Sequence, residues 1–333
     1  MHGEARAILA AMRVVFMGTP EFALPTLRRL IESDHEIVGV FTQPDRPTGR
    51  SRKLAPPPVK RLALEHGLPV YQPASISKPD VVEQLRQLAP DVGVIAAYGQ
   101  ILRQPVLDVP RLGLLNVHAS LLPRWRGAAP IPAAILAGDE RTGATIMQVR
   151  LALDAGPMLA RVAVAIGDDD TTATLTPRIA EAGAALLVDV LPRYAAGAIA
   201  AEEQDEALAT YAPQIEKADA LLDWERDDAT TVWRKVRAYN PWPVAYSYLD
   251  GQPVRLLECV PLDQPAGGQA PGTIIALPAE AAGAARGAGF GIVAAGGVVG
   301  VVRVQGTGGR AMAAAEYLRG HREIVGKRLS AAV

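Results

Sequence analysis

Apolar and polar residues alternate in blocks along the first part of the chain. Short, almost entirely apolar runs are separated by stretches with helical spacing, such as Ala23–Glu32, Val59–His66 and Val81–Leu88. Near-continuous apolar strands that alternate with helices are typical of a mostly parallel sheet with both faces covered. The pattern therefore predicts an α/β domain, with strands in the segments 13–22, 35–44, 91–99, 112–120, 142–151 and 158–167.

The pattern changes near Gly197. Residues 168–197 predict a long helix, whereas the polar stretch that follows shows no clear strand and indicates a linker at 197–213. Beyond it lie short strand-sized runs, closely spaced and punctuated by Gly and Pro, which favour a small β-rich barrel or sandwich. These runs fall at 244–249, 252–260, 272–277, 289–295 and 296–305, and a low-complexity segment at 279–291 is interpreted as a loop insertion.

The composition agrees with two globular domains and indicates the cellular compartment. The chain has 333 residues, 49% of them hydrophobic, which is enough for sizeable cores. No apolar run reaches the roughly 18 residues of a membrane-spanning helix. Cys259 is the single cysteine, which excludes an intrachain disulfide, and no Cys/His cluster suggests zinc. We expect a cytoplasmic protein, and we interpret residues 1–11 as a dispensable extension before Met12 rather than a signal peptide.

Two features that often mark cofactor or metal sites are weak here. A single glycine, Gly18, follows the first strand, where a dinucleotide-binding fingerprint requires three. The acidic triplet Asp168–Asp170 precedes a helix and is interpreted as a cap and solvated loop. Neither feature favours NAD binding or a metal centre.

Charge is nearly balanced overall but uneven locally. The net charge of −1 gives the chain no general affinity for nucleic acid. Between Asp45 and Arg61, however, a loop rich in Pro and Gly, without the periodicity of a helix or strand, carries one acid against six cations. Such a loop can contact phosphates and reach an RNA end, although a solvated charged loop remains the alternative. The cations are Arg46, Arg50, Arg52, Lys53, Lys60 and Arg61.

The segment LLNVHASLLPRWRGAAPI (114–131) carries the candidate chemistry. In a strand, residues i and i+2 share a face, so Asn116 and His118 project together with Val117 on the opposite side. They lie near the carboxyl end of the strand, where open α/β sheets bind ligands. An amide and an imidazole can donate hydrogen bonds to a developing oxyanion, which suits addition to a carbonyl. The alternative is that both residues only satisfy backbone groups of the loop.

Asp154 is the expected partner of His118. It lies in a Gly-containing loop between two predicted strands, and a carboxylate near an imidazole stabilises its charged form or positions a water. An ordinary turn cap is the alternative for this residue. The other four of the five histidines lie in the extension, before a strand, at a helix end and in a charged tail, so His118 alone has a credible location.

The loop after His118 combines aromatic, apolar and basic residues. Leu121 and Leu122 could wall an aromatic ligand, and Pro123 fixes the backbone beside His118. Arg124 and Arg126 flank Trp125, which allows cation–π stacking. A plain surface loop is the competing interpretation.

Several motifs closely resemble the methionyl-tRNA formyltransferase family, over residues 12–329. The most specific are the basic loop GVFTQPDRPTGRSRKLAPPPVK and the segment SLLPRWRGAAPI; GATIMQV, LDAGPML and AYNPWP add to them. The resemblance implies a Rossmann-like formyltransferase domain at 12–196, the linker and an OB-like β-barrel domain at 214–333. It implies transfer of formyl from 10-formyltetrahydrofolate to the methionine amine of initiator methionyl-tRNA, without a metal or a covalent intermediate. We expect a monomer.

The resemblance also assigns residues by motif. It implies that Asn116, His118 and Asp154 are catalytic. It implies that the segment after His118 contacts folate through Ser120, Leu121, Leu122 and Pro123, and that the basic loop enters the acceptor arm of tRNA through Arg46, Arg50, Arg52 and Lys53.

The sequence departs from the family pattern in three places. Pro157 stands where the family usually has an acid, the second domain lacks a strong excess of cations, and residues 1–11 have no counterpart. Two alternative functions remain. An amino-sugar nucleotide formyltransferase of the same fold would share Asn116, His118 and Asp154 but needs neither the basic loop nor the barrel. A non-catalytic RNA-binding protein would not need those three residues together.

Overall fold

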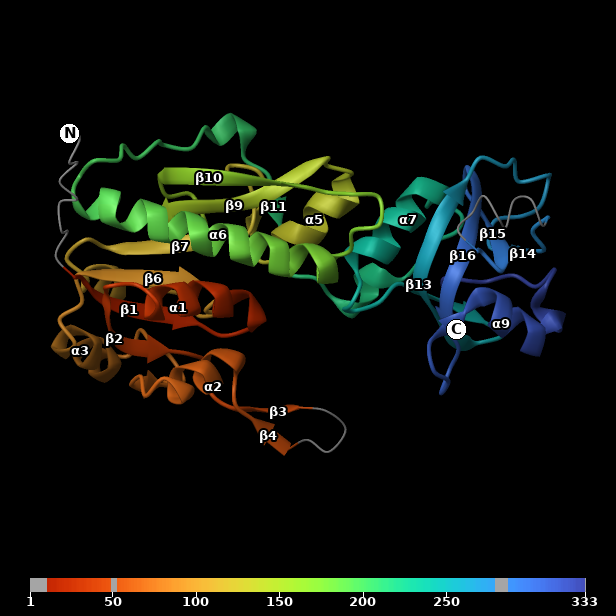
Figure 1. The fold of residues 1–333 in the computed structure, drawn as a ribbon. Helices are drawn as coiled ribbons and strands as arrows, with labels where there is room; N and C mark the ends of the chain where they lie inside the picture. The colour runs from red at the N-terminus through yellow and green to blue at the C-terminus, as the bar shows by residue number, and fades with distance from the viewer. Residues whose placement is uncertain (1–10, 49–52, 279–286, 333) are drawn as a thin grey trace, which may run out of the picture. The chain divides into compact units, whose positions relative to one another are not determined.

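The computed structural model describes residues 11–48, 53–278 and 287–332 (Figure 1). The chain divides into two compact units. The first comprises the chain up to Pro130, together with Arg141–Ala165 and Thr176–Ala212, and the second comprises Ile131–Glu140, Ile166–Leu175 and the chain from Pro213 onward. The extension at 1–10 and the tip of the basic loop at 49–52 lie outside the described residues.

A seven-stranded sheet forms the centre of the first unit, in the order β10-β9-β7-β6-β1-β2-β5. Its pairs are parallel from β7 to β5, whereas β9 pairs antiparallel with both β7 and β10. This confirms the predicted Rossmann-like domain with a mostly parallel sheet. The strands are β1 Arg13–Gly18, β2 Glu36–Phe41, β5 Val70–Tyr71, β6 Val92–Ala96, β7 Leu114–His118, β9 Arg141–Gln148 and β10 Met158–Ala165.

Helices cover both faces of this sheet. On one face, Val15 and Met17 of β1 share a core cluster with Val81 and Leu85 of α3. On the other, α6 packs so closely that a Cβ at Gly183 would lie 2.7 Å from Val117 and 2.9 Å from Ala144. Proline lies in the first turn of several helices, where its missing N–H costs nothing. Examples are α1 Leu24–Ile31, α2 Pro58–Glu65, α3 Pro79–Gln87 and α4 Gln104–Leu107. Short 3₁₀ turns lie at η1 Glu21–Ala23 and η2 Glu206–Leu208, and α5 Pro130–Ala137 and α6 Thr172–Ala195 contain residues of both units.

The carboxyl ends of the central strands meet at one edge of the sheet. The chain runs from β1 to β2 and β5, then returns to β6 beside β1, which creates a topological switch point. Side chains tie the loops there together: Thr19 Oγ1 donates to the Tyr98 carbonyl at 2.9 Å, and Gln43 Nε2 donates to the Gly99 carbonyl at 3.0 Å. This edge is where an α/β sheet of this topology binds its ligand.

The basic loop contains a hairpin that the sequence does not predict. β3 Arg46–Thr48 pairs antiparallel with β4 Lys53–Ala55. The interpretation as a loop without strands is therefore wrong for its two arms. The arms pair through the backbone and bury no apolar face, since Lys53 and Leu54 are both exposed. The sequence of the arms therefore shows no alternation of apolar and polar residues from which a strand could be predicted.

The segment at 197–212 belongs to the first unit by its contacts. Glu202 forms a β-bridge with Met158, and β11 Tyr211–Ala212 pairs in parallel with β8 Arg126–Gly127. The sequence shows no clear strand here because a two-residue pair has no periodicity. The boundaries 1–11, 12–196, 197–213 and 214–333 remain predictions.

The second unit is built on an antiparallel sheet in the order β12-β13-β16-β15-β14, with β17 paired to β16. This agrees with the expected small, OB-like β domain. Its core includes Leu256, Val299 and Val301 from the strands, Val232 from α7 and Tyr317 from α9. The elements are α7 Ala229–Ala238, β12 Tyr246–Leu249, β13 Gln252–Leu262, β14 Ile274–Ile275, β15 Phe290–Ala294, β16 Gly297–Gln305, β17 Met312–Ala313 and α9 Ala314–Gly320, with 3₁₀ turns η3 Lys217–Ala220 and η4 Arg322–Ile324.

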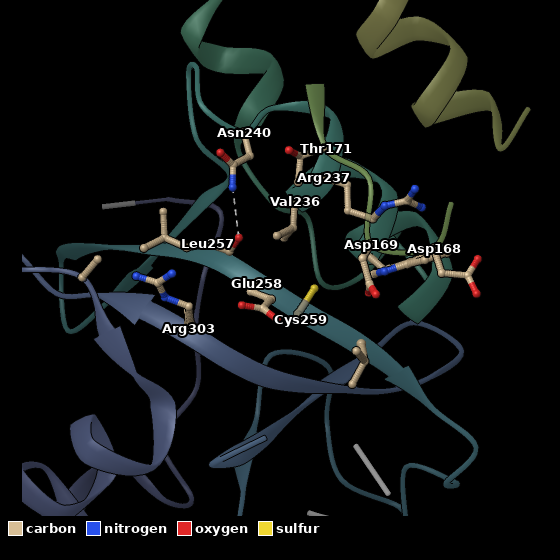
Figure 2. A pocket seen from close by; sticks show the side chains of 13 residues that line it. Asp168, Asp169, Thr171, Val236, Arg237, Asn240, Leu257, Glu258, Cys259 and Arg303 are labelled. Carbon is tan, nitrogen blue, oxygen red and sulfur yellow. Dashed lines mark hydrogen bonds between the residues drawn. The ribbon is translucent and has the colours of Figure 1, made fainter. Parts of the chain in front are cut away.

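A cavity of about 480 Å³ lies within the second unit (Figure 2). The Arg237 guanidinium at its wall stacks over Trp233 at 4.3 Å and donates to the Gly167 and Asp170 carbonyls. Cys259, from β13, also lines it; its thiol is buried, which raises its pKa. A buried, protonated thiol is a packing group rather than a nucleophile.

Among the described residues, no helix combines the length and apolar character needed to cross a membrane. Within the same residues, no group of three or more His, Cys, Asp and Glu side chains gathers where it could hold a metal ion.

Candidate active site

Strand β7 presents Asn116 and His118 on one face at the ligand-binding edge. Leu114 lies two residues before Asn116, on the same strand face, and belongs to the core cluster on the α3 side. Val117 faces α6. The two polar residues are two positions apart in a strand, so their Cα atoms lie about 6.6 Å from each other. Asn116 is half-buried and His118 is 6% exposed. The alternation predicted from the sequence is therefore present.

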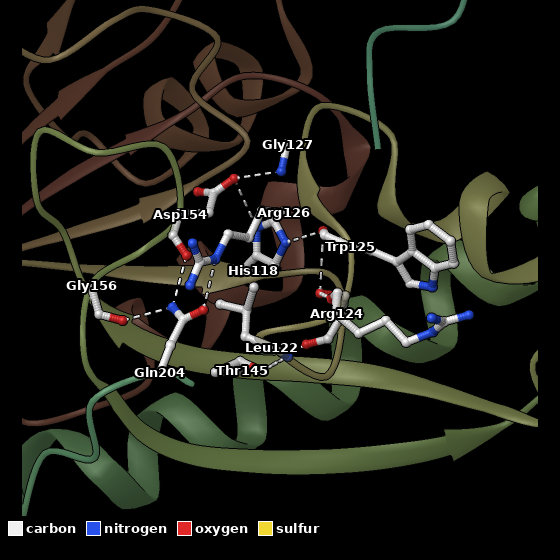
Figure 3. Close-up of polar contacts among 11 residues, drawn as sticks. His118, Leu122, Arg124, Trp125, Arg126, Gly127, Thr145, Asp154, Gly156 and Gln204 are labelled. Carbon is white, nitrogen blue, oxygen red and sulfur yellow. Dashed lines mark hydrogen bonds and ion pairs between the residues drawn. The ribbon is translucent and has the colours of Figure 1, made fainter. Parts of the chain in front are cut away.

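Both ring nitrogens of His118 have defined neighbours (Figure 3). Nε2 lies 2.9 Å from the carbonyl oxygen of Trp125, and Nδ1 lies 3.7 Å from Oδ2 of Asp154. A carbonyl oxygen can only accept, so Nε2 carries the hydrogen and donates it. In the neutral ring Nδ1 is then the nitrogen without a hydrogen, and the Asp154 carboxylate is its neighbour.

A backbone N–H group orients the Asp154 carboxylate. Its Oδ2 accepts a hydrogen bond from the backbone N–H of Gly127 at 2.8 Å. Gly127 has φ +113, and a Cβ there would lie 2.6 Å from the Ala212 carbonyl oxygen. Glycine is thus required at 127 both by the backbone conformation and by the close approach of β11.

A buried polar network that sequence reasoning missed supports the backbone of the Asp154 loop. Gln204 Nε2 donates to the carbonyl oxygens of Asp154 at 2.7 Å and Gly156 at 2.8 Å. Its Oε1 accepts from Arg126 Nε at 3.0 Å, and Arg126 also pairs with Glu206 through bonds of 2.9 and 2.8 Å. The available signal was the position of Arg126 directly before the apolar stretch GAAPI, since a cation that is buried there needs a partner.

The segment proposed for folate contact has two inward-facing and two accessible residues. Ser120 is fully buried and donates to the Arg124 carbonyl at 2.7 Å, and Leu122 is fully buried in a cluster with Met147 and Met158. Leu121 and Pro123 are half-buried. The side chains of Ser120 and Leu122 therefore shape the segment from inside, and Leu121 and Pro123 are the ones accessible to a ligand.

The two arginines beside Trp125 have different roles. The Arg124 guanidinium lies 4.2 Å from the centre of the Trp125 ring, which is the expected cation–π contact. Arg126 does not stack: it is 1% exposed and occupied by Gln204 and Glu206. The cation–π contact that the sequence allows is made by Arg124, whereas contacts with Gln204 and Glu206 keep Arg126 in the interior.

The basic hairpin is fixed at its base. Lys60 Nζ lies 2.9 Å from both carboxylate oxygens of Asp45, and Gln72 Nε2 donates to Oδ1 of Asp45 at 2.7 Å. These hydrogen bonds, that of Gln72 first, hold the pKa of the Asp45 carboxyl below its usual range. Arg46 donates to Gln43 at 3.3 Å and Lys53 is exposed. Arg50 and Arg52 lie outside the described residues.

The remaining described histidines have local structural roles. Nδ1 of His35 accepts from the backbone N–H of Met12 at 3.4 Å, and burial lowers its pKa. His66 is the C-cap residue of α2. His321 contacts the Tyr317 carbonyl and stacks on the Tyr317 ring. Each of these three histidines thus contributes to local structure, and the assignment of His118 to catalysis stays a prediction.

Comparison with known proteins gives relatives along nearly the whole chain. A model of the formyl transferase family matches residues 12–191, and a model of the formyl transferase C-terminal domain matches 214–322. The chain is 52% identical over 318 residues to a methionyl-tRNA formyltransferase of Methylococcus capsulatus, covering 96% of this chain and 99% of the relative. It is 48% identical over 320 residues to one of Thiobacillus denitrificans, covering 96% and 100%.

Solved structures share the fold at lower identity. HypX from Aquifex aeolicus in complex with tetrahydrofolic acid matches with a TM-score of 0.62 and 21% identity, over 95% of this chain and 48% of that one. The chain thus spans about half the length of HypX. An N-formyltransferase from Helicobacter canadensis, in complex with folinic acid and dTDP-3-aminofucose, matches with a TM-score of 0.63 and 13% identity, over 87% and 99%.

Proposed function

The chain belongs to the methionyl-tRNA formyltransferase family, and from that premise we propose that it formylates the free amino group of methionine on initiator methionyl-tRNA. The proposed formyl donor is 10-formyltetrahydrofolate. The observation that carries the proposal is the 52% identity to a methionyl-tRNA formyltransferase over 96% of this chain. The pairing of His118 with Asp154 at the ligand-binding edge supplies chemistry that such a transfer needs.

The proposed reaction replaces one carbon–nitrogen bond with another. The neutral amine of the methionyl ester attacks the formyl carbon, and the carbonyl oxygen becomes an oxyanion. The bond from that carbon to the folate nitrogen then breaks, the amine loses a proton, and the folate nitrogen gains one. An α-amine has a pKa of about 7.7–8.0, which esterification lowers, so neutral nucleophile is present near pH 7.

Asn116 and His118 are proposed to stabilise the oxyanion. The Asn116 amide can donate from the same strand face as His118, in a half-buried site where a hydrogen bond to charge is stronger than in water. Removal of one such donor typically costs roughly 2.7–4 kcal/mol of barrier. Because Nε2 of His118 is bound to Trp125, only Nδ1 is left for the oxyanion, and it donates there when the ring is charged and Nδ1 carries a proton.

Asp154 is proposed to manage the proton that leaves the amine, directly or through a water. Its Oδ2 is oriented by the Gly127 N–H and lies near Nδ1 of His118, so a proton can pass between the two groups as they adjust. His118, once charged, can protonate the departing folate nitrogen. General acid–base catalysis of this kind contributes about 10²–10⁴-fold.

The two substrates are proposed to approach from different elements. Folate contacts the segment at 120–123, where Leu121 and Pro123 are partly accessible. The basic hairpin contacts the acceptor arm of the tRNA through Arg46, Arg50, Arg52 and Lys53, because this stretch carries six cations against one acid and its base is anchored at Asp45.

We also propose that the enzyme acts as a cytoplasmic monomer. The polar groups assigned to catalysis, and the groups that orient them, all come from one chain. Translation takes place in the cytoplasm, where both substrates are available.

A formyltransferase of amino-sugar nucleotides remains the nearest alternative within this fold. The Helicobacter canadensis sugar enzyme is 13% identical to this chain, against 52% for the methionyl-tRNA formyltransferase of Methylococcus capsulatus. A small nucleotide sugar also gives no role to a hairpin of cations.

The test is a formylation assay with purified protein, 10-formyltetrahydrofolate and charged initiator tRNA. The expected product is N-formylmethionyl-tRNA, with much weaker activity on charged elongator methionyl-tRNA. A protein that leaves charged initiator tRNA unmodified but formylates a dTDP-amino sugar would reject the proposal.

A further inference from the structure

Gln204 is the residue that binds the Asp154 loop from inside. It is 8% exposed, and its amide group donates to two carbonyl oxygens of that loop, at Asp154 and Gly156 (Figure 3). A side-chain amide has two N–H donors, so both are satisfied. Its oxygen is satisfied as well, by the Nε–H of Arg126.

Other contacts hold the two ends of the loop: the Gln148 N–H donates to the Pro157 carbonyl at 2.9 Å, and Arg150 pairs with Glu203 at 3.0 and 2.7 Å. Leu151 and Leu153, which precede Asp154 in the loop, are each 63% exposed, so apolar burial does not anchor them. Asp154 has φ +47, in the left-handed region that costs a non-glycine residue free energy unless its surroundings hold it. Gly156 packs against the Gln148 carbonyl so closely that a Cβ would lie 1.8 Å from it.

The orientation of Gln204 is set in turn by a charge pair. Arg126 is 1% exposed and can present its Nε–H only to the oxygen of Gln204, which turns the amide N–H groups toward the loop. The remaining guanidinium nitrogens are bound to Glu206. Exchange of the amide oxygen and nitrogen would place like groups against each other at three contacts, so the network allows one orientation.

From these contacts we infer that Gln204 is a positioning residue for Asp154. Residues 202–206 hold the backbone of the Asp154 loop, while Gly127 holds its carboxylate, and together they set the carboxylate 3.7 Å from Nδ1 of His118. The inference rests on the proposed function, since it assigns the purpose of the network to formyl transfer. Gln204 acts through Asp154 and does not touch the reacting atoms.

Gln204→Glu is the sharpest test, because it keeps the shape and the acceptor for Arg126 while removing both donors. The carboxylate would face two carbonyl oxygens, and the loop would move away from His118. We expect kcat for formyl transfer to fall roughly 10- to 100-fold, the loss typical of a displacement near 1 Å. The KM values for tRNA and folate should stay within about threefold, since neither substrate is assigned a contact with Gln204.

Gln204→Met serves as the second variant, in case the added charge prevents folding. It removes all three hydrogen bonds at similar volume and should lower kcat less than Gln204→Glu does. Gln84→Glu, the same change at an exposed position on α3, is the matched control and should retain wild-type kcat. Hydrogen exchange followed by mass spectrometry should show faster exchange at residues 150–158 in the Gln204 variants than in the control.

The outcomes separate this inference from the proposed function. If the wild-type protein does not formylate charged initiator tRNA, the proposed function fails. If it does, and folded Gln204 variants keep wild-type kcat, or lose activity only through KM, the positioning role is wrong and the network is merely structural.

Discussion

A single backbone carbonyl determines which nitrogen of His118 is left for the proposed reaction. The Trp125 oxygen accepts from Nε2, and Trp125 is itself in the left-handed region with φ +65. Its N–H donates to Thr210 Oγ1 at 2.9 Å, so a residue far along the chain helps to fix this carbonyl. The imidazole is thus oriented in advance, which lowers the reorganisation needed during reaction.

At the residue scale we predict that His118→Ala and Asn116→Ala each lower kcat for formyl transfer by 10²- to 10³-fold, because each removes a donor to the oxyanion. Steady-state kinetics with initiator methionyl-tRNA measures the effect. His66→Ala, at an exposed helix C-cap, is the control and should keep wild-type kcat. Near-normal turnover in a folded His118→Ala or Asn116→Ala variant would remove that residue from the mechanism.

At the scale of elements, the β3–β4 hairpin combines a fixed base with a basic composition. Asp45 accepts from Lys60 and Gln72, so one of the six cations of this stretch serves the protein itself. The proposal assigns the phosphate contacts to Arg46, Arg50, Arg52 and Lys53, and such a local excess of cations is compatible with a net charge of −1 for the whole chain.

We predict that Arg50→Ala raises the KM for tRNA several-fold and leaves folate affinity unchanged, since it removes one phosphate contact. The slope of log affinity for tRNA against log salt should become shallower by about 0.9 or less. Arg29→Ala, an exposed arginine on α1, is the comparison and should alter neither quantity. An Arg50→Ala variant with wild-type tRNA kinetics and salt dependence would contradict the role of the hairpin.

The anchor of the hairpin also predicts a pH effect. The folded-state pKa of Asp45 is lowered, chiefly by the hydrogen bond from Gln72, so its contribution to stability is fully present above the unfolded value of about 3.9. That contribution is lost as the pH falls from there through the lowered pKa. When the pH is lowered from 5 to 3, the melting temperature of Asp45→Asn should therefore fall less than that of the wild type.

Thermal unfolding at a series of pH values measures this difference. Asp263→Asn, at an exposed position of the second unit, controls for the loss of one carboxylate and should follow the wild-type curve. Parallel curves for wild type and Asp45→Asn would show that the Asp45 contacts contribute nothing to stability.

At the scale of the whole molecule, the assigned groups come from one chain, and we predict a monomer of 35.1 kDa. Light scattering after size-exclusion chromatography measures the mass, and formylation activity per chain should not change with protein concentration. A dimer that loses activity on dilution would mean that a second copy contributes to the site.

The sequence by itself indicated most of the elements and placed Asn116 and His118 on one face of a strand. Apolar runs fixed the strands because a parallel sheet buried on both faces tolerates little else. Asn116 and His118 share a face because alternation is a property of the strand backbone, independent of what surrounds it. The likeness of the motifs indicated the family and the α/β and β-rich domains. The sequence did not predict two-residue strands such as β5 and β11, or the arms of the hairpin. These segments show no alternation of apolar and polar residues.

Only the tertiary structure decided how distant residues meet. The order of strands brings Asp154 to His118, and no local pattern encodes that order. Arg126 is buried, and Gln204 is bound to the Asp154 loop, because residues 202–212 return to pair with β10 and β8. In the sequence, Gln204 is one polar residue in a polar stretch. Its role depends on hydrogen-bond geometry between separate segments, and that geometry exists only in the folded chain.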